Sequence, residues 1–302
     1  MRIVFMGTPD FAATILSGLI SSKHRVMAVF TQPDKPNGRG HKLSISPVKI
    51  LALESDISVL QPITLKDEKV AVQISNLDPD IIVVAAYGML LPESILKIPK
   101  RGCINVHGSL LPKYRGAAPI QWAVINGEKE TGITIMNMET GLDCGDIICQ
   151  KAIQIKESDT ASSLYLSLAE IGKNELLRGI ELISSSGFVP QKQNEDEASF
   201  APKLTKEMGN LNFNESAHTV LNLIRGLDVW PVAQTIITGQ KVKIYKAAVV
   251  EGFNLAPNEV FIDKRLIVGC RDLTLELLEV RPENGKRMSG EAFVNGLSGK
   301  SS

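Results

Sequence analysis

Residues 81–87, Ile-Ile-Val-Val-Ala-Ala-Tyr, decide the fold class of this chain. An uninterrupted run of β-branched and small apolar residues is typical of a central parallel strand that is buried on both faces. Further strands are predicted by short apolar segments at 2–6, 25–30, 102–107 and 132–138. Strands that alternate with helical segments indicate an α/β fold with a Rossmann-like, doubly wound parallel sheet.

The first predicted helix follows the first strand. Residues 11–20 have apolar side chains at helical spacing, and Asp10 is expected to cap this helix. A dinucleotide-binding turn would place G-x-G-x-x-G here, but only Gly7 is present and Pro9 lacks an N–H. We therefore expect a Rossmann-like fold without a nicotinamide cofactor. The segment is interpreted as a tight strand-to-helix turn, with substrate recognition as the alternative.

The second half of the chain has a different pattern. Leu, Ile and Ala at helical spacing predict one long helix over 161–184, and the polar segment 190–199 predicts a surface linker. Strands then dominate, at 240–250, 266–270 and 273–280, with one helix at 214–227. We expect a larger domain over 1–188, a linker over 189–204 and a smaller, OB-like β-barrel domain over 205–302.

Composition excludes several classes of protein. The 302 residues include 33 Lys and Arg and 33 Asp and Glu, so any contact with nucleic acid must come from a local basic patch. No apolar run approaches the ~20 residues of a membrane helix, and no signal peptide is recognisable, so a cytoplasmic protein is expected. The four cysteines are expected to be reduced thiols. A metal site built from Cys103, His107, Cys144 and Cys149 matches no common zinc spacing, so we expect no metal.

The residues best suited to chemistry lie at the end of the strand predicted over 102–107. Asn105 and His107 are two positions apart and so share one side of that strand, at the edge where open parallel sheets bind ligands. Their side chains are donors that could stabilise an oxyanion. Asp143 lies in a loop between Gly141 and Gly145, where it could orient His107 or accept a proton. Purely structural roles remain the alternative, because the sequence does not show whether the two loops meet.

Four segments carry a resemblance to a known family: Gly7-Thr8-Pro9-Asp10-Phe11-Ala12, Asn105-Val106-His107-Gly108-Ser109-Leu110-Leu111-Pro112, Tyr114-Arg115-Gly116-Ala117-Ala118-Pro119 and Gly141-Leu142-Asp143-Cys144-Gly145-Asp146. Together they resemble the folate-dependent formyltransferases, and among these the methionyl-tRNA formyltransferases. The resemblance extends from about residue 2 to about residue 250. It implies that 10-formyltetrahydrofolate donates a formyl group to the α-amine of initiator methionyl-tRNA by addition–elimination, without a metal.

The resemblance also implies roles for residues. Asn105, His107 and Asp143 match the family's catalytic trio, with Asp143 chiefly the partner of His107. The residues that match its folate-contacting segments are Leu110, Leu111, Pro112, Lys113, Tyr87, Gly88, Met89 and Leu90. In the family, the segment equivalent to 31–42, including the arginine matched by Arg39, engages tRNA, and the family suggests a monomer.

Local charge agrees with a tRNA acceptor. Between residues 34 and 49, Lys35, Arg39, Lys42 and Lys49 outnumber Asp34, and such a loop could contact phosphates. Further candidates for tRNA contact precede and lie within the C-terminal domain, at Lys203, Lys206, Lys241, Lys243 and Lys246. Two alternatives stay open: formylation of a sugar nucleotide or other small amine, and a non-catalytic tRNA-binding protein on an inherited enzyme fold. The sequence does not show how initiator tRNA would be distinguished from elongator tRNA.

Overall fold

The computed structural model describes residues 1–37 and 42–298, which form two compact units. The first unit contains residues 1–116, 131–153 and 165–200. The second contains 117–130, 154–164 and the chain from Ala201 onward. No helix in the described part of the chain is long and apolar enough to span a membrane.

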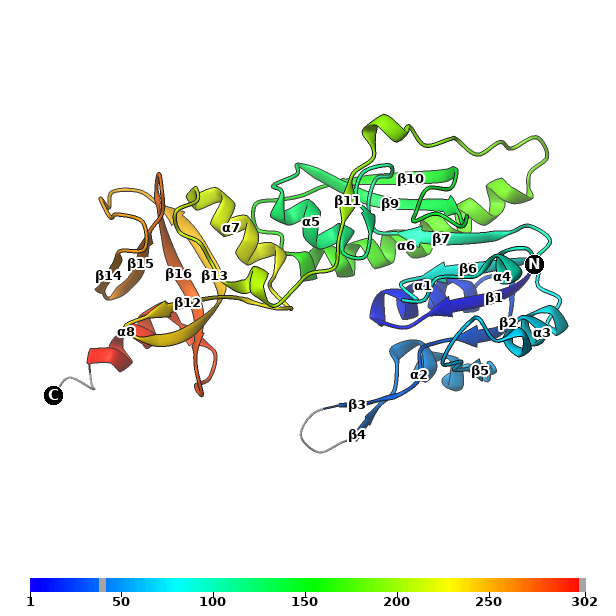
Figure 1. The fold of residues 1–302 in the computed structure, drawn as a ribbon, viewed down its shortest axis with the longest axis horizontal. Coiled ribbons are helices and arrows are strands. Elements are labelled where there is room, and N and C mark those ends of the chain that lie inside the picture. Colours follow the sequence, from blue (N-terminus) through cyan, green and yellow to red (C-terminus); the bar gives the residue numbers. More distant parts are fainter. Residues whose placement is uncertain (38–41, 299–302) are drawn as a thin grey trace. The chain divides into compact units, whose positions relative to one another are not determined.

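A seven-stranded sheet in the order β10-β9-β7-β6-β1-β2-β5 lies at the centre of the first unit (Figure 1). Its strands are β1 (Arg2–Gly7), β2 (Arg25–Phe30), β5 (Val59–Leu60), β6 (Ile81–Ala85), β7 (Cys103–His107), β9 (Glu130–Asn137) and β10 (Ile147–Gln154). From β5 to β7 all neighbours are parallel, which confirms the predicted Rossmann-like α/β class. β9 departs from the parallel pattern, because it pairs antiparallel with β7.

Helices cover both faces of this sheet. They are α1 (Asp10–Ile20), α2 (Pro47–Glu54), α3 (Glu68–Asn76), α4 (Glu93–Leu96) and α6 (Ala161–Ser184). On one face, Val4 and Ile82 pack in a single cluster with Ile74 of α3 and Ile95 of α4. On the other face α6 approaches β7 closely, since a Cβ at Gly172 would lie 3.1 Å from Val106. The long helix predicted over 161–184 is confirmed.

Several shorter elements complete the first unit. They are β3 (Lys35–Asn37), β4 (Lys42–Ser44), β8 (Arg115–Gly116) and the 3-10 helix η1 (Glu195–Glu197); β11 (Phe200–Ala201) follows at the boundary between the units. The predicted loop over 31–42 therefore contains a strand that pairs antiparallel with the next one. The prediction that Asp10 caps α1 is wrong. Pro9 is the extended N-cap residue and Asp10 is already helical, so its carboxylate lies in the first turn, where an acidic group is favourable.

The second unit contains an antiparallel half-barrel. Its strand order is β12-β13-β16-β15-β14, with β17 paired to β16. The elements are α5 (Pro119–Ile125), η2 (Glu207–Gly209), α7 (Ala217–Gly226), β12 (Ala233–Ile237), β13 (Gln240–Val250), β14 (Val260–Asp263), β15 (Arg265–Gly269), β16 (Thr274–Pro282), β17 (Met288–Ser289) and α8 (Gly290–Ser298). Phe213, Val220, Ile244 and Phe293 share its core. Helix α8 was not predicted from the sequence. Its Phe293 and Val294 are buried although small and polar residues surround them.

Candidate active site

Strand β7 presents Asn105 and His107 on one face of the sheet. Residues 103, 105 and 107 alternate with Val106, whose side chain faces α6 on the opposite side. Asn105 is half-buried and its amide has no hydrogen bond to the residues that the structure describes. His107 is only 5% exposed and lies opposite Thr134 of β9. The strand therefore offers one unengaged amide and one enclosed imidazole.

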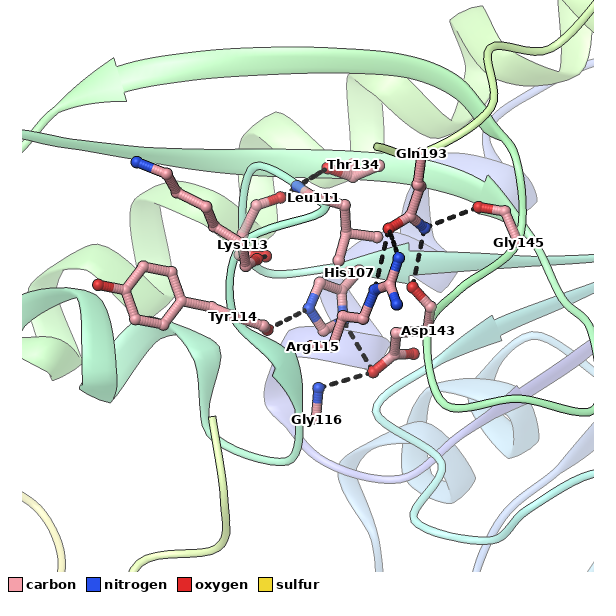
Figure 2. Close-up of polar contacts among 11 residues, drawn as sticks. His107, Leu111, Lys113, Tyr114, Arg115, Gly116, Thr134, Asp143, Gly145 and Gln193 are labelled. Carbon is pink, nitrogen blue, oxygen red and sulfur yellow. Dashed lines mark hydrogen bonds and ion pairs between the residues drawn. The ribbon is translucent and has the colours of Figure 1, made fainter. Parts of the chain in front are cut away.

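Both ring nitrogens of His107 face polar groups (Figure 2). Nε2 is 2.9 Å from the Tyr114 carbonyl oxygen, and because a carbonyl only accepts, Nε2 carries the hydrogen. Nδ1 lies 3.7 Å from Oδ2 of Asp143. The Asp143 carboxylate therefore faces the ring nitrogen that does not bind the Tyr114 carbonyl. The structure thus brings together His107 and Asp143, whose proximity the sequence did not establish.

The loop that carries Asp143 joins β9 to β10 and has an unusual backbone. Asp143 has a φ of +48°, in the left-handed region that L-residues seldom adopt. At Gly145 a Cβ would collide with the Asn137 carbonyl, so glycine alone fits there. The Gly116 N–H donates to Oδ2 of Asp143 at 2.8 Å, which fixes the carboxylate beside His107.

The segment after β7, with the predicted folate residues Leu110, Leu111, Pro112 and Lys113, is fastened by a buried hydroxyl. The Thr134 hydroxyl donates to the Ser109 carbonyl at 2.6 Å and accepts from the Leu111 N–H at 3.1 Å. Gln150 donates to the Leu111 carbonyl at 2.8 Å. Leu111 is buried, whereas Lys113 is exposed. This segment leaves the sheet at the same edge as the segment after β6, because β6 and β7 are parallel neighbours.

The segment after β6 holds the other predicted folate residues, Tyr87, Gly88, Met89 and Leu90. The Tyr87 carbonyl accepts from Thr8 and from Gln32, which ties the ends of β1, β2 and β6 together. The Tyr87 hydroxyl is buried without a hydrogen-bond partner among the described residues, and burial raises its pKa to about 12. Leu90 is 84% exposed, an unusual position for a large apolar side chain beside polar site residues.

The predicted tRNA-contacting residues are separated in the chain. Lys35 is exposed and donates to Gln32 at 3.0 Å. Arg39 lies outside the described residues, and Lys42 is described only as the first residue of β4. In the second unit, Lys203 and Lys206 are exposed. Lys49 adds little to the local positive charge, because it forms a 2.5 Å ion pair with Asp34.

The structure shows no role for the four cysteines at this site. All four cysteines are free, and burial raises the pKa of Cys103 and Cys149 to about 12. Within residues 1–37 and 42–298, no three His, Cys, Asp or Glu side chains gather closely enough to hold a metal ion.

Sequence reasoning missed several residues that build the site. Thr134 and Gln150 fasten the segment after β7, and Gly116 binds the Asp143 carboxylate. Gly116 and Arg115 lie within the motif 114–119, but the resemblance implies no role for either residue. Gln193 contacts the loop that carries Asp143, but the sequence predicts that it lies in a linker. Its neighbours in the sequence are polar, so no local pattern indicates a role in the site.

Comparison with known proteins places this site in a family. Residues 1–180 match the formyl transferase domain, and residues 203–298 match the formyl transferase C-terminal domain. The chain belongs to the formyl transferase family. It is 49% identical to a methionyl-tRNA formyltransferase of Caldanaerobacter subterraneus, over 98% of this chain and 97% of that protein.

Solved structures share the fold. A methionyl-tRNA formyltransferase from Clostridium thermocellum matches with a TM-score of 0.58 and 20% identity, over 82% of this chain and 93% of that one. An N-formyltransferase from Helicobacter canadensis, solved with folinic acid and dTDP-3-aminofucose, matches with a TM-score of 0.68 and 20% identity. That match covers 92% of this chain and 98% of the other.

Proposed function

We propose that this protein transfers the formyl group of 10-formyltetrahydrofolate to the α-amine of initiator methionyl-tRNA. The observation that carries the proposal is the approach of His107 Nδ1 to Asp143 Oδ2, 3.7 Å apart, on the strand face that also carries Asn105, whose amide has no hydrogen bond to the described residues. Near-full-length identity of 49% to a methionyl-tRNA formyltransferase supports this choice of acceptor. We further propose that the protein acts in the cytoplasm as a monomer.

The proposed reaction is addition–elimination at the formyl carbon. The neutral amine attacks the carbon, a C–N bond forms, and the formyl oxygen becomes an oxyanion. The Asn105 amide stabilises this oxyanion by hydrogen bonding, and a protonated His107 stabilises it by its charge. The tetrahedral intermediate collapses with cleavage of the bond to folate N10. The amine loses a proton and N10 gains one, so charge and protons balance.

Asp143 serves chiefly as the charge partner of His107. Its carboxylate is already bound by the Gly116 N–H at 2.8 Å, and it faces the imidazole within ion-pair distance. A carboxylate held in this way stabilises the cationic ring that the oxyanion requires. Proton relay from the amine through Asp143 is the secondary role.

The folate co-substrate is proposed to lie along the two segments that leave β6 and β7. They supply Tyr87, Gly88, Met89 and Leu90 on one side, and Leu110, Leu111, Pro112 and Lys113 on the other. Exposed apolar surface at Leu90 suits a flat ring system, and the buried Tyr87 hydroxyl lacks a partner within the described chain. The exposed Lys113 ammonium suits the carboxylates of a folate tail.

Contact with tRNA is proposed for Lys35, Arg39 and Lys42 in the first unit and for Lys203 and Lys206 in the second. The second unit also has a cavity of about 340 Å³ whose charged lining residues are Lys241, Lys243, Arg281 and Glu283, three cations and one anion. Lys243 and Arg281 are direct cross-strand partners, a repulsive pairing that phosphate would relieve. Partial burial lowers the pKa of Lys243, and the positive charges of Arg281 and Lys241 lower it further. We propose residues 1–188 as the catalytic domain, 189–204 as linker and 205–302 as the tRNA-binding domain.

A formyl-transfer assay with competing acceptors tests the function. Wild-type protein is incubated with 10-formyltetrahydrofolate and, in separate reactions, initiator methionyl-tRNA, free methionine and an amino-sugar nucleotide. Mass spectrometry of each amine detects the added formyl group. We expect transfer to methionyl-tRNA alone. Transfer to the amino sugar but not to tRNA would replace this proposal with the small-amine alternative, and tRNA binding without any transfer would favour the non-catalytic one.

A further inference from the structure

We infer that Gln193 is a positioning residue of the active site, one that sets the backbone of the loop carrying Asp143. The inference rests on the proposed formyl transfer for its kinetic consequence, but its structural consequence can be measured separately. Gln193 lies in the segment 189–204, where composition predicts only a connection between domains.

The amide group of Gln193 spans the catalytic loop. Its Nε2 donates to the Asp143 carbonyl at 2.8 Å and to the Gly145 carbonyl at 2.7 Å (Figure 2). Both hydrogens of one side-chain amide are therefore used on carbonyls two residues apart. Asp143, which carries the first of these carbonyls, has a φ of +48°, a conformation that needs support from its surroundings. With the backbone held in this way, the Asp143 side chain reaches the Gly116 N–H and His107.

Arg115 fixes the orientation of that amide. Its guanidinium donates to Gln193 Oε1 from Nε at 3.1 Å and from a terminal nitrogen at 2.7 Å. A guanidinium has no acceptor, so the oxygen of Gln193 must face it and the NH₂ group must face the loop. The Arg115 side chain is 5% exposed and also makes two hydrogen bonds to Glu195, at 2.8 and 2.7 Å. These bonds raise the pKa of Arg115, which keeps it charged.

Neighbouring contacts hold the segment itself in register with the site. The Gln191 backbone pairs with Ile147 at the start of β10. Ser199 accepts from the Tyr114 N–H through its hydroxyl and from the Arg115 N–H through its carbonyl. Gln193 lies between these two anchors. The segment thus contributes to the geometry of the His107–Asp143 pair rather than only joining domains.

Two variants and a matched control test the inference. Gln193→Ala removes both donors. Gln193→Glu keeps the length and the contact with Arg115, but as a carboxylate it presents only acceptors to the two carbonyls. Gln191→Ala is the control, because Gln191 is exposed two residues away and its side chain makes no hydrogen bond within the described chain. Initial rates of formyl transfer to methionyl-tRNA give kcat and KM for each, and thermal unfolding monitors the fold.

We expect Gln193→Ala to lower kcat by about 10–100-fold, as small misplacements of catalytic groups do, with little change in KM for either substrate. Gln193→Glu should be impaired similarly at every pH tested, because the Arg115 guanidinium stabilises its carboxylate and a carboxylate offers no donor to the two carbonyls. The ratio of Gln193→Ala to wild type should not vary with pH. Unchanged kcat in both variants, or losses that simply follow the unfolding temperature, would overturn the inference.

A second readout does not depend on activity. Cys144 lies between the two carbonyls that Gln193 binds and is half-buried, while the other three thiols are buried. If Gln193 holds this loop, Gln193→Ala makes alkylation of Cys144 severalfold faster and Gln191→Ala does not. An unchanged alkylation rate would count against the inference, whether or not the wild-type protein is active. Inactivity of the wild-type protein on methionyl-tRNA would instead refute the proposed function.

Discussion

The two halves of the candidate site are held in place by different means. Asn105 and His107 lie on β7, a central strand whose neighbours on both sides fix its register. Asp143 lies on a loop, and its position depends on Gly116, Gln193 and a left-handed backbone. The strand-borne half is set by regular backbone pairing, and the loop-borne half by individual side-chain hydrogen bonds.

This difference implies different sensitivity to substitution. A strand within a sheet tolerates the loss of one side chain without moving, so changes at Asn105 should affect chemistry alone. The loop has few backbone hydrogen bonds of its own, so losing a distant side chain should shift Asp143 and lower the rate. The following predictions, from the largest expected effect to the smallest, test this contrast.

Asn105→Ala should lower kcat by about 10²–10³-fold, because one oxyanion donor is lost. The unfolding temperature should remain close to that of wild type, since the amide makes no hydrogen bond within the described chain. Steady-state kinetics and thermal unfolding measure the two quantities. Near wild-type turnover would show that Asn105 does not act on the transition state.

Arg115→Lys should lower kcat about tenfold, because an ammonium cannot bind Gln193 and Glu195 with the paired geometry of a guanidinium. Arg178→Lys is the matched control. Arg178 is half-exposed and makes a simple ion pair with Glu175, a type that contributes little. Equal activity of the two variants would contradict the idea that the loop-borne half depends on this network.

Thr134→Val should destabilise the protein by about 1–3 kcal/mol, because it leaves the Ser109 carbonyl and the Leu111 N–H unpaired at a buried position. Thr131→Val on the same strand should be neutral or stabilising. The Thr131 hydroxyl is buried without a hydrogen-bond partner in the described residues. Urea unfolding of both variants measures the difference in stability. Equal shifts in the two midpoints would show that the Thr134 hydroxyl contributes no more than the Thr131 hydroxyl.

Tyr87→Phe should leave the free energy of unfolding unchanged or slightly higher, because it removes a buried hydroxyl that has no partner among the described residues. If that hydroxyl donates to folate, KM for the formyl donor should rise about 3–10-fold. The raised pKa of about 12 keeps the phenol protonated, so its contribution should be constant between pH 7 and 9. An unchanged KM for the donor would remove Tyr87 from the folate site.

Much of this fold could be predicted from local pattern. The run at 81–87 correctly identified a central strand, though β6 ends at Ala85 because Ala86 turns into the left-handed region. The antiparallel placement of β9 could not be predicted, because its alternation of residues is compatible with either direction of pairing. Helix α8 was missed because its short apolar sequence becomes buried only against β15 and β16.

By itself, the sequence determined the parallel strands β1, β2, β6 and β7, the long helix α6, the shared face of Asn105 and His107, and the motifs that mark the formyl transferase family. Apolar periodicity and turn residues act locally, so they can be recognised without coordinates. Only the tertiary structure decided that Asp143 lies beside His107 and that Gln193, 50 residues further along the chain, holds its loop. Such contacts join polar side chains from separate segments, and no local pattern encodes which buried partners will meet.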